Sequence, residues 1–220
     1  MSTLSFTFDD GRANHVTPGS RILDEFGFKG TFYVCPGLVG EERYEWERPA
    51  QRIELASWAE IEYAAAGGHE IGNHSWNHPS FPYASKRKRA TPHWMERQAV
   101  KSAEAIKKRI PLKEFTWAWP YHWSVTHMTT LIKEHHIGIR PFHNKRTYNM
   151  DWPPFEYAEF LNNFVDELLH HDSWGCAVIH DMDVGHNPLP SDVFRKHLEY
   201  VASQDIEVKT VAEVLREARS

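Results

Sequence analysis

The sequence has few of the features that mark secreted, membrane or redox-active proteins. Among its 220 residues are only two cysteines, Cys35 and Cys176, each within an apolar run, so we expect buried thiols rather than a disulfide or a zinc-binding cysteine motif. No apolar run is long enough to span a membrane, and the N-terminus lacks the basic and apolar stretches of a secretion signal. We therefore expect no membrane partner and a cytoplasmic location.

The chain also lacks an excess of positive charge, with 25 Lys and Arg against 30 Asp and Glu. The formal net charge is −5, so we expect no nucleic-acid partner, because there is no basic excess to neutralise phosphates. One basic run, from Lys86 to Arg89, has two interpretations: a solvated loop, or a docking site for an anionic polymer. No glycine-rich phosphate loop follows a strand-like run, which argues against a dinucleotide-binding domain.

What the chain does contain is a regular alternation of β-rich and amphipathic runs. With 41% hydrophobic residues it can bury one substantial core, so we expect residues 1–220 to form a single domain. The alternation predicts an α/β fold with about seven parallel strands in a closed or nearly closed β/α barrel; an open doubly wound sheet is the alternative. The expected strands are 4–8, 30–35, 69–73, 115–118, 137–141, 175–180 and 206–209.

Several helix starts are also readable. Ser57 with Glu60 and Thr210 with Glu213 have the spacing of capping boxes, and Thr91-Pro92 is typical of a helix N-cap followed by proline. Ser124 and Ser191 are further expected N-caps.

Chemically capable side chains follow many of the expected strands. They are Asp9 and Asp10, His74, Tyr121, Arg140, and His180 with Asp181. In β/α barrels the active site lies at the C-terminal ends of the strands, so these residues are expected to meet at one rim.

The strongest local signal is His74-Ser-Trp-Asn-His78. Histidines four apart can face the same way on a helical turn, and neutral imidazole is the commonest zinc ligand, although chance pairs are expected in a chain with 15 histidines. One of the adjacent Asp9 and Asp10 could complete a three-ligand site that leaves room for water, with the other free to act as a base. The alternative for Asp9-Asp10-Gly11 is an ordinary turn.

The remaining histidines carry less information. We expect His15, His93, His127 and His197 on or near helices at the surface. Three others, His122, His143 and His186, lie in expected loops beside the proposed site, and the sequence assigns them no role.

Four ordered segments, SFTFDDG, NHSWNH, WAWPYHW and VIHD, resemble the motifs of the polysaccharide deacetylase family, also called carbohydrate esterase family four or the NodB homology domain. The resemblance implies a distorted β/α barrel that removes acetyl groups from N-acetylated, or sometimes O-acetylated, sugars with one divalent metal ion. It implies Asp9 as catalytic base, His180 as catalytic acid, and Asp10, His74 and His78 as metal ligands. Pro120 and Tyr121 would line the site, with the Tyr121 backbone N–H holding the oxyanion.

The chain also departs from the family pattern. An arginine that often precedes the third-motif proline is Ala118 here, the glycine that often follows the tyrosine is His122, and the aspartate–tryptophan motif is matched only loosely by Asp151-Trp152. We expect Arg140, at the end of the next strand, to replace the missing arginine and pair with Asp9. A surface position paired with another carboxylate is the alternative.

Four tryptophans, Trp76, Trp119, Trp123 and Trp152, cluster around the motifs, and each could simply pack. Of these, Trp76 and Trp123 lie in expected loops and are our candidates for substrate contact. The expected cofactor is Zn²⁺, with Co²⁺, Ni²⁺ or Fe²⁺ as alternatives, and the expected partner is an acetylated sugar or oligosaccharide. Hydrolysis of a non-sugar amide, or a sugar-binding relative without catalysis, are the competing functions.

Overall fold

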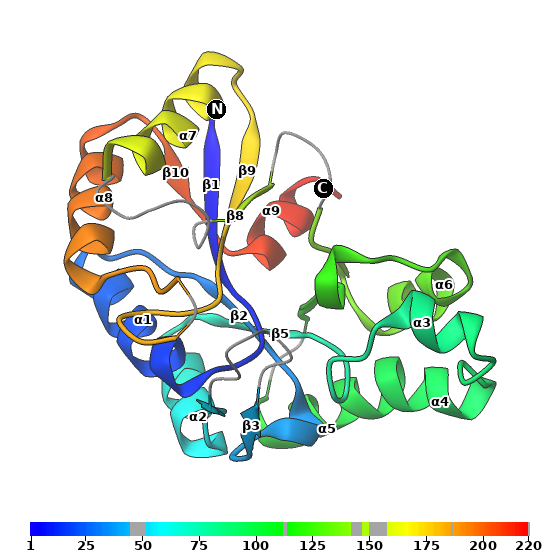
Figure 1. The fold of residues 1–220 in the computed structure, drawn as a ribbon. Helices are drawn as coiled ribbons and strands as arrows, with labels where there is room; N and C mark the ends of the chain where they lie inside the picture. Colours follow the sequence, from blue (N-terminus) through cyan, green and yellow to red (C-terminus); the bar gives the residue numbers. More distant parts are fainter. Residues whose placement is uncertain (45–51, 112–113, 142–146, 150–157, 186, 220) are drawn as a thin grey trace.

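Helices pack around a curled parallel sheet, forming a distorted β/α barrel (Figure 1). The computed structural model describes residues 1–44, 52–111, 114–141, 147–149, 158–185 and 187–219. The sheet strands are β1 (Thr3–Phe8), β2 (Thr31–Val34), β5 (Glu70–Asn73), β6 (Thr116–Trp117), β7 (Gly138–Ile139), β8 (Thr147–Asn149), β9 (Trp174–Ile179) and β10 (Glu207–Val208). Their order is β7-β6-β5-β2-β1-β9-β8, and β10 also pairs with β1.

The expected strands all form, and the barrel expectation is confirmed over the open doubly wound sheet. Beyond those seven, the sheet contains β8, and a separate antiparallel pair joins β3 (Glu42–Tyr44) to β4 (Arg52–Glu54). Each of these additional strands is only three residues long, which is too short for a reliable alternation pattern in the sequence.

Helices connect most of the strands. The α-helices are α1 (Ala13–Glu25), α2 (Trp58–Ala66), α3 (Phe81–Lys86), α4 (Pro92–Glu96), α5 (Ser102–Arg109), α6 (Thr126–His135), α7 (Ala158–His170), α8 (Ser191–Ser203) and α9 (Val211–Glu217). A π-helical segment, η2 (Arg97–Lys101), joins α4 to α5, and short 3₁₀ turns lie at η1 (Pro36–Leu38) and η3 (Pro120–His122). No helix in the described ranges is both long and apolar enough to cross a membrane.

Local sequence signals account for three of the helix starts. Both capping boxes are present, at Ser57 and at Thr210, and the Thr91 side chain accepts a hydrogen bond from the Trp94 backbone N–H. The expected caps at Ser124 and Ser191 are wrong. The N-cap residues there are Val125 and Pro190, and the Ser191 hydroxyl donates to Asp183 instead.

Strand β1 lies at the centre of the sheet and presents different chemistry on its two faces. Phe6 and Phe8 pack edge-on against Phe194 of α8, with ring centroids 5.5 and 6.3 Å apart. The opposite face carries Ser5 and Thr7, which are fully buried and hydrogen-bonded. The outer face of β1 is thus an apolar helix contact, whereas the inner face is polar and can hold charged side chains.

A second hydrophobic cluster supports the helices α3, α4 and α6, separately from the main core. It contains Phe81, Ala99, Trp117, Trp119, Met128 and Ile132. Trp119, one of the four tryptophans near the motifs, is therefore a packing residue. Cys35 and Cys176 are both buried thiols, as expected.

Candidate metal centre and active site

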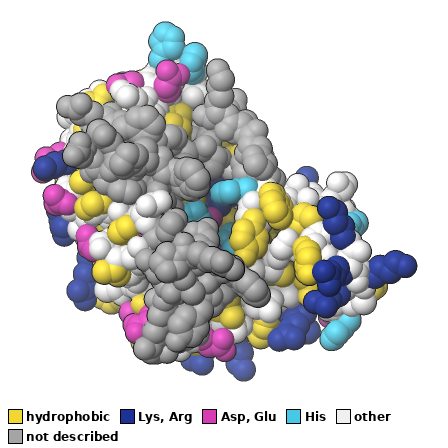
Figure 2. Space-filling model, in the orientation of Figure 1, with side chains coloured by type: hydrophobic (Ala, Val, Ile, Leu, Met, Phe, Trp, Pro, Cys, Tyr) yellow, Lys and Arg dark blue, Asp and Glu magenta, His cyan; other side chains and the backbone are white. Residues whose placement is uncertain are grey.

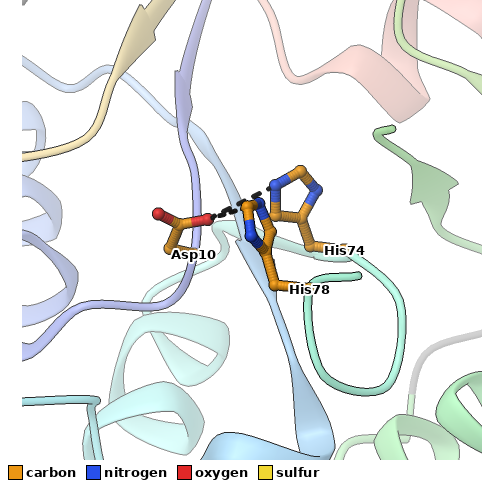
Figure 3. A group of neighbouring side chains, drawn as sticks. All are labelled: Asp10, His74 and His78. Atoms are coloured by element: carbon orange, nitrogen blue, oxygen red, sulfur yellow. Dashed lines mark ion pairs between the residues drawn. The ribbon is translucent and has the colours of Figure 1, made fainter. Parts of the chain in front are cut away.

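Asp10, His74 and His78 converge at the C-terminal ends of β1 and β5 (Figure 3). The Asp10 Oδ1 atom lies 3.5 Å from His74 Nε2 and 3.1 Å from His78 Nε2. These side chains are nearly buried, with 12%, 2% and 10% of their areas exposed for Asp10, His74 and His78. The two histidines lie on a turn that follows β5, and not on a helical turn as the sequence suggested.

The donor set and its spacing suit a divalent cation. A tetrahedral ion with bonds of about 2.0–2.2 Å keeps its ligands about 3.3–3.6 Å apart, which is close to both of the observed histidine–aspartate separations. The Oδ1 atom of Asp10 is buried and has no hydrogen-bond partner among the described residues. A buried anionic oxygen without a hydrogen bond is costly, and a cation between it and the two histidine nitrogens would satisfy it.

Local backbone geometry orients the ligands. Asp10 and His78 both have positive φ angles, 73° and 52°, which are uncommon for residues other than glycine. The His74 Nδ1 atom lies 2.9 Å from the Ala118 carbonyl oxygen, which must accept a hydrogen bond. The proton is therefore on Nδ1, and Nε2 keeps the lone pair that a metal ligand needs.

Arg12 is a functional candidate that the sequence analysis did not identify. Its Nε and Nη2 atoms donate to Asp10 Oδ2 at 3.1 and 2.7 Å, and its Nη1 donates to Asp181 at 2.8 Å. The guanidinium thereby occupies one oxygen of Asp10 and leaves the other facing the histidines. Asn14 also donates to Asp181, so Asp181 and Asn14 fix the guanidinium that holds Asp10 in place.

Arg140 lies against Asp9, the pairing expected from the sequence. Its two terminal nitrogens donate to the two carboxylate oxygens of Asp9 at 2.5 and 2.7 Å, and Nη1 also donates to Thr7. Both charged side chains are at least 98% buried. The guanidinium is 4.8 Å from the Tyr33 ring centroid, so an aromatic face covers it inside the barrel.

Electrostatics keep both aspartates ionised. Burial by itself would raise the pKa of Asp9, but the charge of Arg140 and its hydrogen bonds to the carboxylate outweigh it and lower the pKa below its usual value. Burial also opposes ionisation of Asp10, and His78 and Arg12 outweigh it, so the pKa of Asp10 lies well below the usual range. Both groups therefore remain carboxylates at neutral pH, as a base and a metal ligand require.

His180 follows β9 and lies beside the expected base. Its Nε2 atom is 4.0 Å from Asp9 Oδ2, and 27% of the side chain is exposed. His15, which we expected at the surface, is instead fully buried in α1, where its Nδ1 atom donates to the His180 carbonyl oxygen at 2.7 Å. The expectation of a surface position for His197 was also wrong, because this residue lies on the buried face of α8.

The segment WAWPYHW, residues 117–123, adds an aromatic surface next to the candidate metal ligands. Tyr121, with a φ angle of 56°, places its ring centroid 4.5 Å from that of His78, and the Trp123 ring lies 6.0 Å further on. Pro120 is buried, whereas the side chains of Tyr121 and Trp123 are about half exposed. The three rings thus extend from the candidate metal centre to solvent.

Trp76 and His122 also lie near the candidate site. Trp76 is half-buried on the turn between the histidine ligands, with Arg97 5.2 Å from its ring centroid. His122, left open by the sequence, is mostly buried. Its pKa falls to about 4 through burial first and then through the charge of Arg140. His143, Asp151, Trp152 and His186 lie outside the described residues.

The family model for polysaccharide deacetylases matches residues 1–138, more than half of the chain. The chain belongs to the polysaccharide deacetylase family. A curated member, the chitooligosaccharide deacetylase of Azorhizobium caulinodans, is 27% identical over 184 residues, covering 82% of this chain and 74% of that protein. The peptidoglycan-N-acetylglucosamine deacetylase PgdA of Listeria monocytogenes is 34% identical over 86 residues, which is 34% of this chain but only 13% of the relative's length.

The fold is that of solved polysaccharide deacetylase family structures. A family four acetyl xylan esterase from Clostridium thermocellum, solved with a cobalt ion, superposes with a TM-score of 0.65 at 21% identity. The match covers 98% of this chain and 91% of that one. At this level of identity the likeness establishes the fold, and the chemistry of this family member has to be argued from its own residues.

Proposed function

We propose that this protein is a metal-dependent deacetylase that removes acetyl groups from an N-acetylated carbohydrate. The observation that carries the proposal is one cluster of five side chains: Asp10, His74 and His78 as a metal-binding triad, with Asp9 and His180 beside it. A structural metal site needs only ligands. Beside this triad, Asp9 is a buried carboxylate held by Arg140, in the position that a general base needs.

Asp10, His74 and His78 would hold the ion, and we propose Zn²⁺, with Co²⁺, Ni²⁺ or Fe²⁺ as alternatives. When bound, such an ion would supply Lewis-acid chemistry, lowering the pKa of a water and polarising the acetyl carbonyl. The five charged side chains Asp9, Asp10, Asp181, Arg12 and Arg140 sum to −1. A divalent cation would bring the site to +1, which suits a reaction that develops an oxyanion.

The chain's own residues would perform the proton transfers. Asp9, held by both terminal nitrogens of Arg140, would take a proton from the attacking water. The Tyr121 backbone N–H would donate a hydrogen bond to the developing oxyanion. His180 would give a proton to the departing sugar nitrogen, so that the C–N bond breaks to leave a neutral amine. Trp123 and Pro120 would border the sugar.

The experiment is acetate release from N-acetylated chito-oligosaccharides, with and without a chelator, followed by restoration with Zn²⁺. We expect activity that is lost on chelation and recovered with metal. Asp9→Asn should lower kcat by about 10²- to 10⁴-fold while metal content stays close to that of the wild type. His180→Ala should impair amide substrates more than activated esters, which need little proton donation.

Other outcomes would redirect the assignment. Acetate release from O-acetylated xylan alone would make the protein an esterase. Hydrolysis of a formamide or cyclic ureide, without release from any sugar, would favour the non-sugar amide reaction. Binding of oligosaccharides with no turnover under any metal would indicate a non-catalytic relative.

A further inference from the structure

Positive charge is concentrated in one part of this acidic protein. Residues 86–109 contain nine Lys or Arg and two Glu, a net charge of +7, in a chain with a formal charge of −5; the rest of the chain therefore carries −12. This segment runs from the end of α3 through α4 and η2 to the end of α5. Figure 2 shows the resulting Lys and Arg side chains gathered at the right of the view, over α3 and α4.

A surface groove of about 400 Å³ lies on this basic segment. Its lining comprises Trp76, His93, Arg97, Lys101, Glu104, Ala105 and Lys108. Its volume is within the range of ligand sites. Lys101 is paired with Glu104 at 3.0 Å, whereas no ion pair is found for Arg97 or Lys108 with the residues that the structure describes. Two cations in the groove are therefore available to an anionic ligand.

The groove shares a wall with the metal-binding turn. Trp76 lies between the ligands His74 and His78 in the chain, and its backbone N–H donates to Gln98 Oε1 at 3.1 Å. Gln98 Nε2 donates to Asn77 on the same turn at 3.0 Å. Gln98 belongs to the π-helical segment η2, next to Arg97, and π-bulges occur frequently at functional sites. A ligand in the groove is thus next to the turn that positions the metal ligands.

We propose that this groove binds a carboxylate-bearing stretch of the glycan whose acetylated sugar occupies the metal centre, so that the substrate is an acidic oligosaccharide. The proposal rests on the proposed function and specifies its substrate class. Arg97 and Lys108 are eleven residues apart, from η2 to the last turn of α5, which is about 16 Å along a helix. Such separated single charges match carboxylates repeated along a sugar chain. A phosphate monoester would require several donors that converge on one point.

The test measures binding without turnover. The probe is hexagalacturonate, which carries a carboxylate on every sugar and no acetyl group, and cellohexaose is its neutral counterpart of equal length. Calorimetric titration of the metal-loaded protein should show hexagalacturonate binding more tightly than cellohexaose at about 20 mM salt, and the difference should shrink at about 0.5 M salt, where the Debye length is only a few Å.

The variant Arg97→Gln with Lys108→Gln should weaken hexagalacturonate binding about threefold to tenfold, as expected for the loss of two exposed charge contacts. The matched control is Arg21→Gln with Lys196→Gln. Arg21 is an exposed arginine 5.4 Å from the centroid of the Tyr63 ring, at a second groove, and the control removes the same total charge. It should leave the affinity unchanged.

Equal weakening by both variant pairs, or no preference for hexagalacturonate over cellohexaose, would overturn the proposal. Tighter binding of a phosphorylated oligosaccharide, of DNA or of anionic lipid vesicles would assign the groove to that ligand instead. Because the titration requires no acetyl group, its result is independent of the acetate-release assay. Failure of the assay would contradict the deacetylase function, and failure of the titration would contradict only the acidic substrate.

Discussion

Arg140 shows how a single buried residue can determine the properties of the proposed catalytic base, Asp9. We expect Arg140→Ala to lower kcat about 10²-fold or more, because a misplaced reacting group costs about that much. It should also raise the pKa of Asp9 by removing the opposing charge, so the acidic limb of the kcat/KM profile should move to higher pH. The measurement is the pH profile of acetate release, together with metal content.

Arg140→Lys provides the control, because it keeps the charge but not the two-pronged contact. We expect the acidic limb to stay near its wild-type position while kcat remains low. Removing one partner of a buried ion pair costs about 3–5 kcal/mol, so unfolding is measured for both variants. A folded Arg140→Ala protein with the wild-type pH profile would show that the ion pair has only a structural role.

Arg12 makes a prediction about metal binding. Partners that hydrogen-bond a metal ligand typically account for 10- to 100-fold in affinity, so Arg12→Met should weaken metal binding by about that factor. The cause is the loss of the two hydrogen bonds that orient Asp10. Competition with a coloured chelator measures it, and Arg195→Met, which breaks an exposed pair with Glu25, is the control. Tighter metal binding would mean that charge repulsion by Arg12 outweighs orientation.

At the scale of elements, the π-helical segment η2 contacts, through Gln98, the turn that carries the candidate metal ligands His74 and His78. Gln98 is 2% exposed and contacts Trp76 and Asn77 on that turn. Gln98→Met keeps the side-chain length but leaves the Trp76 N–H without its partner, which costs about 1–3 kcal/mol. We expect weaker metal binding in the same competition assay, by about 10-fold. Gln204→Met, far from the turn in sequence, should bind metal as the wild type does.

At the scale of the whole molecule, buried histidines make stability depend on pH. Burial lowers the pKa of His136 to about 4 and that of His197 to about 3, from 6.5. Between pH 6.5 and about 4 the unfolded chain binds protons at these sites and the folded protein does not. The free energy of unfolding should therefore fall as the pH falls, by on the order of 1.4 kcal/mol per pH unit for each histidine.

Urea unfolding at several pH values in this window measures the slope. His197→Gln keeps a polar group near Asn162. It should reduce the slope of unfolding free energy against pH by the contribution of one histidine, about 1.4 kcal/mol per pH unit. The control His93→Gln changes a side chain that is 91% exposed and should leave the slope as it was. A slope that His197→Gln does not alter would show that other groups control the acid sensitivity.

The sequence by itself determined seven strands, the parallel sheet and the members of the candidate metal triad, because alternation, capping and strand-end position are local properties. The sequence also predicted that Arg140 pairs with Asp9, on the argument that strands consecutive in the chain lie side by side in the barrel. In the structure β7 and β1 are separated by β6, β5 and β2, and only the curl of the sheet lets Arg140 reach Asp9 across the barrel interior. The sequence carried no signal for Arg12 or Gln98 and predicted a surface position for His15. The tertiary structure decided that these residues support the site, since hydrogen bonds between residues distant in sequence leave no periodic signal.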